Sequence, residues 1–194
     1  IGSEIDNTRA IALADVDGDG DLDLVAGNDV QTNKLYLNDG SGGFDATGTN
    51  IGSETDSTHA IALADVDGDG DLDLVAGNSI QTNKLYLNGG SGGYATTGTN
   101  IGSETDNTIA IALGDVDGDG DLDLVAGNFG STNKLYLNNG SGGFAATGTD
   151  IGSETDSTYA IAVADVDGDG NLDLIVGNSN QTNKLYLNDG SGGF

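Results

Sequence analysis

The sequence lacks cysteine, proline, methionine and tryptophan altogether. Without cysteine there is no disulfide framework, no thiolate zinc site and no cysteine nucleophile. The single histidine leaves almost no histidine-based acid–base or zinc chemistry. No run of about 18 apolar residues is present, so the sequence predicts no membrane-spanning helix. Because the initiator methionine is also missing, we expect Ile1 to be a start made by processing or proteolysis, after removal of any export signal.

Positive charge is scarce as well. Only 5 lysine and arginine residues stand against 32 acidic residues, which gives a formal net charge of −27. Such a chain repels phosphate backbones and anionic lipids, so neither nucleic acid nor a membrane surface is an expected partner. The 34 glycines and the high charge would suit disorder. The order of the residues instead predicts a thin core that is repeated many times.

One unit recurs four times with a period of 50 residues and no insertions. The segment that begins at Ile1 returns from Ile51, Ile101 and Ile151. We interpret residues 1–194 as a single repeat domain with units 1–50, 51–100, 101–150 and 151–194, the last unit lacking the start of its final strand. A fixed period of this length is typical of propellers and other repeat arrays.

Each unit carries four short strand signals. In the first unit they lie at residues 10–14, 22–26, 34–37 and, more weakly, 47–51, with glycine- and asparagine-rich turns between them. No segment keeps a helical spacing for three turns. The sequence therefore predicts an all-β fold, a β-propeller of four-stranded antiparallel blades with four blades per chain. A parallel β-helix needs a shorter period, and a helical solenoid needs the missing helical spacing.

The chemistry of the repeat lies in an aspartate loop that follows the first strand. Carboxylates occupy loop positions 1, 3, 5 and 9 with glycine at position 6, as in the first part of an EF-hand loop. Hard divalent cations prefer six to eight oxygen ligands, and position 7 contributes its backbone carbonyl. Without a cation, so many clustered carboxylates would repel one another. The alternative is a solvated acidic turn.

The predicted ligands are the loop residues of all four units, and we expect about one Ca²⁺ per unit, four per chain. They are Asp15, Asp17, Asp19, Asp21, Asp23, Asp65, Asp67, Asp69, Asp71, Asp73, Asp115, Asp117, Asp119, Asp121, Asp123, Asp165, Asp167, Asp169, Asn171 and Asp173. An EF-hand would continue into a helix with glutamate at position 12. Here position 12 is Ala26 or its equivalent, and the sequence enters a strand.

The motif DVDGDGDLDLVAGN, followed by NKLYLNDGSGGF, resembles the FG-GAP/VCBS repeats, which also form calcium-binding blades in integrin α-subunits. The resemblance extends over all four units. It implies a propeller in which each calcium loop links the first and second strands of a blade at one face, while the first strands line the central channel. It also implies a secreted or cell-surface protein that serves in adhesion or recognition. Propellers of this family usually have about seven blades, whereas this chain has four.

The last unit ends after its third strand, and the equivalent of the missing piece begins at Ile1. Such a blade needs the N-terminal segment to complete it, or it leaves an exposed edge. The chain can close on itself as a four-bladed ring, two chains can form an eight-bladed ring, or exchange can continue into a filament or scaffold. We favour the dimer, because nearly identical blades make intermolecular joints as good as intramolecular ones.

A few positions differ between the units and are the internal clue to specificity. The residue before the first strand is Arg9, His59, Ile109 or Tyr159, and the turn after the second strand includes Phe129 in the third unit. Drift at exposed turns is the alternative explanation. The candidate ligand-binding residues are Arg9, His59, Phe129 and Tyr159. The repeated Tyr36 lies within a strand and is expected to pack, and Phe44 is expected to wedge between blades.

Three functions remain open at this stage. The first is a calcium-stabilised extracellular propeller that acts as a structural or recognition module, with a protein or glycan as its ligand. The second is a calcium-dependent lectin that binds sugars between blades. The third is an enzyme, which we do not expect: the carboxylates are committed to cations, and a Ser-His-Asp arrangement would rest on His59, which occurs in one unit only.

Overall fold

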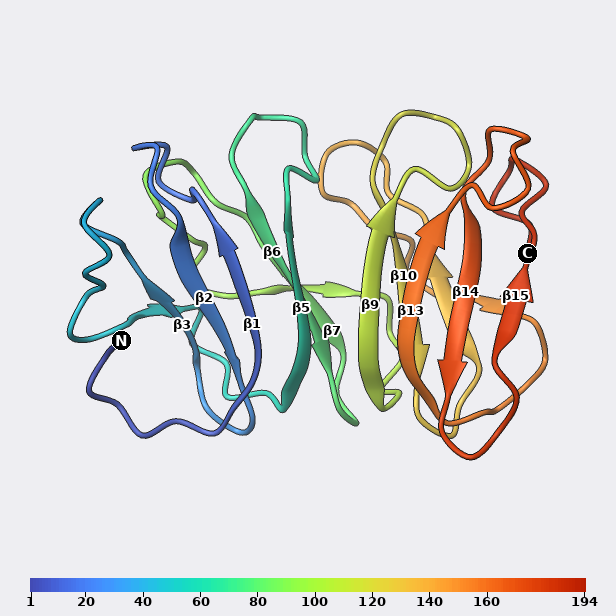
Figure 1. The fold of residues 1–194 in the computed structure, drawn as a ribbon, viewed down its shortest axis with the longest axis horizontal. Helices are drawn as coiled ribbons and strands as arrows, with labels where there is room; N and C mark the ends of the chain where they lie inside the picture. The colour runs from blue at the N-terminus through green and yellow to red at the C-terminus, as the bar shows by residue number, and fades with distance from the viewer.

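The computed structural model describes residues 1–194 and consists of strands, turns and irregular segments, arranged as four antiparallel sheets in sequence order (Figure 1). The first two sheets contain β1 (Thr8–Ala14), β2 (Asp23–Asn28), β3 (Asn33–Tyr36) and β4 (Thr49–Ile51), then β5 (Thr58–Ala64), β6 (Asp73–Asn78), β7 (Asn83–Tyr86) and β8 (Thr99–Ile101). The last two contain β9 (Thr108–Gly114), β10 (Asp123–Asn128), β11 (Asn133–Tyr136) and β12 (Thr149–Ile151), then β13 (Thr158–Ala164), β14 (Asp173–Asn178) and β15 (Lys184–Tyr186). The all-β class and the antiparallel blades are confirmed, and the fourth sheet has three strands.

The strand limits differ from the predicted ones by one or two residues, and side-chain hydrogen bonds explain two of the differences. The fourth strand begins at Thr49 rather than residue 47, because the Gly48 N–H donates to Glu4 Oε1 at 2.7 Å instead of to a neighbouring strand. The second strand begins at Asp23, because the Leu22 carbonyl accepts a hydrogen bond from Asn38 Nδ2 at 3.0 Å. Each of these bonds shortens a strand by one or two residues and leaves the pairing of the remaining residues unchanged.

Within each sheet, the first and second strands form the longest antiparallel pair. In the first sheet Ala14 lies opposite Asp23 at one end and Thr8 lies opposite Asn28 at the other, with an irregularity between Thr8 and Ala10. The same register recurs in the other three sheets. In every sheet, the loop that joins the first and second strands therefore lies at one end of the strands. The turn that joins the second and third strands lies at the other end.

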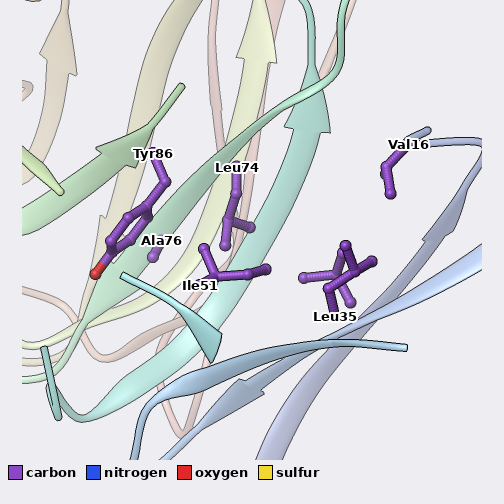
Figure 2. Close-up of a cluster of buried hydrophobic side chains, with 7 residues drawn as sticks. Val16, Leu35, Ile51, Leu74, Ala76 and Tyr86 are labelled. Atoms are coloured by element: carbon purple, nitrogen blue, oxygen red, sulfur yellow. The ribbon is translucent and has the colours of Figure 1, made fainter. Parts of the chain in front are cut away.

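The core lies between consecutive sheets. One cluster joins Val16, Val25 and Leu35 of the first sheet with Leu74 and Tyr86 of the second, and Figure 2 shows these side chains converging from both sheets, with Ile51 in the middle. Equivalent clusters join the second sheet to the third and the third to the fourth. Tyr36 and its equivalents pack as predicted, and Tyr94 packs against the first of these clusters. The two inner sheets therefore each contribute to two of these clusters, and the first and fourth sheets each contribute to one.

The four sheets form an open arc. The first strands lie side by side in the order β1, β5, β9 and β13, while the N- and C-termini lie at opposite ends of the arc (Figure 1). The first and fourth sheets lie at opposite ends of the arc in Figure 1, so one chain does not close a ring in this structure. No helix long and apolar enough to cross a membrane is present.

Candidate metal centre and the opposite edge

The four aspartate loops connect the first and second strands of their sheets. They run from residue 15 to residue 22 and recur from residues 65, 115 and 165. All four lie along the same edge of the arc, the upper edge in Figure 1. In every sheet the aspartate loop thus joins two paired strands, and the positions of the strand ends set the distance that the loop bridges.

Backbone amides hold the first carboxylate of each loop in place. Asp15 Oδ1 accepts a hydrogen bond from the Gly18 N–H at 2.8 Å, and Asp15 Oδ2 accepts one from the Gly20 N–H at 2.9 Å. This curl requires a positive φ at Gly20, where φ is 97°. Equivalent bonds hold Asp65, Asp115 and Asp165. The first carboxylate is therefore oriented by the loop's own backbone.

The carboxylate at position 9 is buried under the loop. Asp23 is fully buried, and its two oxygens accept hydrogen bonds from the Val16 N–H at 3.1 Å and the Asn38 N–H at 2.8 Å. The same pair of bonds holds Asp73, Asp123 and Asp173. This residue ties the loop to the end of the third strand and fixes the floor of the site.

The carboxylates gather into one group per loop. In each group three ligand atoms lie within 4.8 Å of one another. The groups are Asp15 with Asp17 and Asp19, Asp65 with Asp67 and Asp73, Asp115 with Asp117 and Asp123, and Asp165 with Asp167 and Asp173. All the donors are carboxylate oxygens, the ligands that hard divalent cations prefer, so each group can bind a metal ion.

Burial opposes charge at the two central sites. Removal from solvent, with a smaller contribution from neighbouring aspartates, raises the pKa of Asp73 and of Asp123 to about 6. The fourth loop lies at the open end of the arc, where the backbone N–H groups of Asn188 and Val166 lower the pKa of Asp173. A bound cation would favour the ionised form at all four sites, and most strongly where the carboxylate is enclosed.

The structure does not bring every predicted ligand into these groups. The side chain at position 7 turns away from the loop: a side chain added at Gly40 would collide with the Asp21 carboxylate, and Gly190 stands in the same way against Asn171. Asp71 and Asp121 lie likewise beside Gly90 and Gly140. This orientation leaves only the backbone of position 7 for an ion. Asp19 belongs to the group in the first loop, whereas Asp69, Asp119 and Asp169 lie outside theirs.

The four candidate ligand-binding residues lie at the opposite edge and form two separate pairs. Arg9 donates to Asp29 Oδ2 at 2.8 Å, and His59 Nε2 of the next sheet lies 3.9 Å from Asp29 Oδ1. Phe129 of the third sheet meets Tyr159 of the fourth edge to face, with ring centroids 5.8 Å apart. Sequence reasoning missed that Asp29 lies beside both Arg9 and His59. The signal was available, since Asp29 is the only acid at that turn position.

Ser57, His59 and Asp29 lie together, but their geometry is not that of a nucleophilic triad. Ser57 Oγ donates a hydrogen bond directly to Asp29 Oδ1. His59 Nε2 lies 3.3 Å from Ser57 Oγ and is also the nitrogen nearest to Asp29. In a triad the two nitrogens of the histidine contact the serine and the aspartate separately. Here one nitrogen faces both, and the serine proton points to the carboxylate.

Sequence reasoning also missed the asparagine that follows each third strand. Its backbone N–H binds the buried aspartate of its own loop, while its side chain reaches the loop of the preceding sheet: Asn88 Nδ2 donates to the Val16 carbonyl at 2.9 Å. Asn138 and Asn188 repeat both bonds. The recurrence of this asparagine at the same position of every unit was the only sign in the sequence that it has a structural role. Three of the four aspartate loops are therefore bonded to the next sheet.

Stacked four-stranded sheets with an oxygen-lined loop at one edge define a β-propeller-type repeat protein with candidate metal sites. The profile of the FG-GAP-like repeat matches residues 15–76, 65–126 and 115–176. The chain belongs to the FG-GAP-like repeat family, as the sequence motif indicated. No curated protein matches it in sequence.

Solved structures share this fold. A lectin from Agrocybe aegerita, described as recognising non-reducing terminal N-acetylglucosamine, is 22% identical, with a TM-score of 0.67 over 97% of this chain and 51% of its own. The biofilm matrix protein Bap1 of V. cholerae is 25% identical, with a TM-score of 0.55 over 86% of this chain and 23% of its own. BBS1N, solved in complex with ARL6DN, is 14% identical, with a TM-score of 0.59 over 92% of this chain and 49% of its own. The chain spans about half of the lectin and of BBS1N and about a quarter of Bap1.

Proposed function

We propose that the chain is a calcium-stabilised, extracellular recognition module that binds its ligand without catalysis. The observation that carries this proposal is the fourfold recurrence of one oxygen-lined loop at one edge, with backbone amides already orienting its carboxylates. Membership of the FG-GAP-like repeat family supports calcium as the ion. The ligands support it too, because oxygen atoms in a flexible loop suit Ca²⁺ better than Mg²⁺, which requires a rigid octahedral geometry. The ion would neutralise part of each acidic group and so hold its two strands together.

The binding role is supported by the contrast between the two edges. Ions would serve a structural purpose at the aspartate edge, while the opposite edge presents a different set of side chains in each sheet. The arrangement of Ser57, His59 and Asp29 gives no poised base, which favours binding over catalysis. The similarity to a lectin and to a biofilm matrix protein is consistent with a recognition role.

Calcium titration by isothermal calorimetry, combined with native mass spectrometry, tests the proposal. We expect four Ca²⁺ per chain and a lower melting temperature in EGTA, with Mg²⁺ as the matched control that binds more weakly. Dissociation constants of about 10⁻⁴–10⁻³ M would fit an extracellular module, whereas values near 10⁻⁸ M would fit an intracellular buffer. Absence of bound calcium, or an unchanged melting temperature in EGTA, would contradict the proposal.

A second candidate function is carbohydrate binding, which a polar hollow of about 310 Å³ favours. The buried Asp6 Oδ2 at this hollow has no hydrogen-bond partner, and Asp56 Oδ2 is in the same state one unit later. Carboxylates, amides and hydroxyls are groups that bind sugar hydroxyls. The lining residues are Asp6, Val30, Gln31, Thr32, Lys34, Asn50 and Thr55.

A glycan array probed with the wild-type chain in calcium tests this second function. We expect binding of one class of sugar, its loss in Asp6→Ala together with Asp56→Ala, and its retention in Asp45→Ala, which removes an exposed acid outside the hollow. An array without signal, or one that the double variant leaves unchanged, would argue for a protein ligand instead.

A further inference from the structure

Two Asn-Gly steps, Asn88-Gly89 and Asn139-Gly140, lie in the turns that follow the third strands of the second and third sheets. Asparagine is a thermolabile residue, because the next backbone nitrogen can attack its side-chain amide carbon. A following glycine leaves that nitrogen most accessible, since glycine has no Cβ and the widest range of backbone conformations. Both turns belong to inner sheets with a neighbour on each side, so their surroundings can be compared directly.

The first of these steps is held in an unreactive arrangement. Asn88 is 2% exposed, and its Nδ2 donates to the carbonyls of Val16 at 2.9 Å and Leu72 at 3.3 Å. The Gly89 N–H donates to the Gly93 carbonyl at 3.2 Å. Attack on Asn88 Cγ would break all three bonds, and Asn88 Oδ1 has no hydrogen-bond donor to stabilise the charge that the attack creates.

The second step has an exposed side chain and a free nucleophile. Asn139 is exposed, and neither its Nδ2 nor the Gly140 N–H makes a hydrogen bond. In the first sheet the equivalent N–H, that of Gly40, donates to Asn38 Oδ1 at 3.2 Å. In the third sheet Asn138 Oδ1 instead accepts the Asn139 N–H at 2.8 Å, which leaves the Gly140 nitrogen unbonded.

The same turn stabilises the charge that an attack on Asn139 would create. Asn139 Oδ1 accepts hydrogen bonds from the Ser141 N–H and the Gly143 N–H, both at 3.1 Å. When the Gly140 nitrogen attacks Cγ, negative charge develops on this oxygen. Two backbone donors that already face the oxygen lower the barrier in the manner of an oxyanion hole. The folded turn therefore favours the reaction at Asn139, whereas the turn at Asn88 opposes it.

We propose that Asn139 is a site of spontaneous modification, at which the folded turn promotes conversion of asparagine to aspartate and isoaspartate by water. The Gly140 nitrogen bonds to Asn139 Cγ and releases its proton to solvent. The side-chain nitrogen takes up a proton and leaves as ammonia, and a cyclic imide remains. Water then opens the ring. Cleavage between the nitrogen and Cγ yields aspartate, whereas cleavage between the nitrogen and the main-chain carbonyl carbon yields isoaspartate.

The two products differ in how they fit the neighbouring sheet. Aspartate already occupies the equivalent position as Asp39, whose Oδ1 accepts the same two backbone bonds at 2.9 Å. Isoaspartate adds one methylene to the main chain of a tightly packed turn. A Cβ atom added at Gly142 would lie 3.2 Å from Leu85 Cδ2 and 3.5 Å from Asp67 Cβ of the second sheet. Isoaspartate at position 139 should therefore disturb the second aspartate loop, to which Asp67 belongs.

Peptide mass spectrometry of the folded wild type, aged at mildly alkaline pH, tests the proposal. Trypsin cleaves after each lysine, so the two Asn-Gly steps fall in separate peptides, 85–134 and 135–184, and Asn88 serves as the internal control. We expect peptide 135–184 to gain the mass of one amide-to-acid conversion, located at Asn139 by fragment ions, at least about tenfold faster than peptide 85–134. In urea the two rates should converge, and Asn139 should react no faster than in the folded chain.

The variant Asn139→Asp separates the two products. It should unfold at the same urea concentration as the wild type, whereas the aged fraction that an isoaspartate-specific methyltransferase labels should unfold at a lower one. Circular dichroism confirms that the aged sample is folded. Equal rates at the two steps in the folded chain, an earlier mass gain at another asparagine, or a faster reaction of Asn139 in urea would overturn the proposal. None of these readouts measures calcium, so they stand apart from the titration that tests the proposed function.

Discussion

The two edges of the arc are built from the same repeat, yet the key loop residues at one edge are identical in every unit, whereas the turn residues at the other edge differ between units. At the aspartate edge, loop positions 1, 3, 5, 6 and 9 are identical in all four units. At the opposite edge, the turn is held by backbone bonds, such as Ser79 N–H to the Ser57 carbonyl at 2.8 Å and Phe129 N–H to the Asn107 carbonyl at 2.9 Å. At the first edge the side chains of the repeated loop define the site, whereas at the second edge backbone bonds hold the positions whose side chains differ between units. The second edge can therefore vary its side chains without losing its structure.

The largest expected effect comes from removing one carboxylate at the aspartate edge. Asp117→Asn should reduce the bound calcium from four ions to three per chain. It should lower the free energy of unfolding by about 3 kcal/mol at calcium 100-fold above the dissociation constant, because the linkage term of that ion is lost. For a chain of this length, that shifts the melting temperature by roughly 5–10 °C. Native mass spectrometry and calorimetry measure both quantities.

The matched control for this prediction lies four residues away in the same loop. Asp121→Asn removes the same charge, but the Asp121 side chain lies against Gly140 outside the group, and the fourth unit already carries Asn171 at this position. It should keep four ions. If Asp121→Asn loses an ion as Asp117→Asn does, the assignment of position 7 as a backbone ligand is wrong.

A smaller effect is expected where the aspartate edge is bonded to the neighbouring sheet. Asn138→Ala removes the hydrogen bonds from Nδ2 to the Val66 and Leu122 carbonyls, at 2.8 and 3.1 Å, and leaves buried acceptors without partners. We expect a loss of about 2 kcal/mol in urea unfolding. Asn38→Ala loses the exposed bonds from Nδ2 to the Leu22 carbonyl and from the Gly40 N–H to Oδ1 but none to another sheet, so it should cost less, about 1 kcal/mol. Both variants are compared with the wild type, and equal losses would contradict a role of the Asn138 side chain in holding consecutive sheets together.

The aspartate edge was largely predictable from the sequence, because its determinants are local. The spacing of Asp15, Asp17 and Asp23 and the glycine at position 20 define a loop whose ends the flanking strands fix. The family resemblance added the order of the strands. The spacing also assigned the backbone carbonyl of position 7 to the ion, which agrees with the Asp21 side chain lying outside the group. What the spacing did not reveal was that this side chain lies against Gly40, in a turn that packs against the loop from outside.

The contacts between consecutive sheets and the opposite edge were harder to predict from the sequence, because their residues come from different units. The bond from Asn88 to Val16 spans 72 residues, and nothing in a repeated asparagine distinguishes a turn residue from a donor to the preceding sheet. The pairing of Phe129 with Tyr159 likewise depends on how consecutive sheets face each other. A period of 50 residues defines a blade, but it leaves the curvature of the stack undetermined.

At the variable edge, the aromatic pair should contribute about 1 kcal/mol. Phe129 and Tyr159 meet edge to face, at an interplanar angle of 87°, and both rings are partly exposed. A double-mutant cycle of Phe129→Ala and Tyr159→Ala in urea should give a coupling free energy of about 0.5–1.5 kcal/mol. Calcium stoichiometry should stay at four in all variants. A coupling near zero, or a change in bound calcium, would break the proposed separation between the two edges.

The smallest expected effect is that of the ion pair at the first sheet. Arg9 is half exposed and binds Asp29 at 2.8 Å, so Arg9→Ala should cost at most about 0.5 kcal/mol, and high salt should abolish the difference. The hydrogen bond from Ser57 is the main cause that lowers the pKa of Asp29, and Arg9 comes second. A carboxyl whose pKa is lowered by folding stabilises the fold above the ordinary aspartate pKa, and this stabilisation is lost as the pH falls below that value. Ser57→Ala should therefore reduce the loss of unfolding free energy at acidic pH more than Arg9→Ala does. Urea unfolding measured from neutral pH down to about pH 3 compares the two variants, since an ordinary aspartate titrates near 3.9. A larger loss for Arg9→Ala would mean that the charge of Arg9, rather than the partly buried hydroxyl of Ser57, holds Asp29 in place.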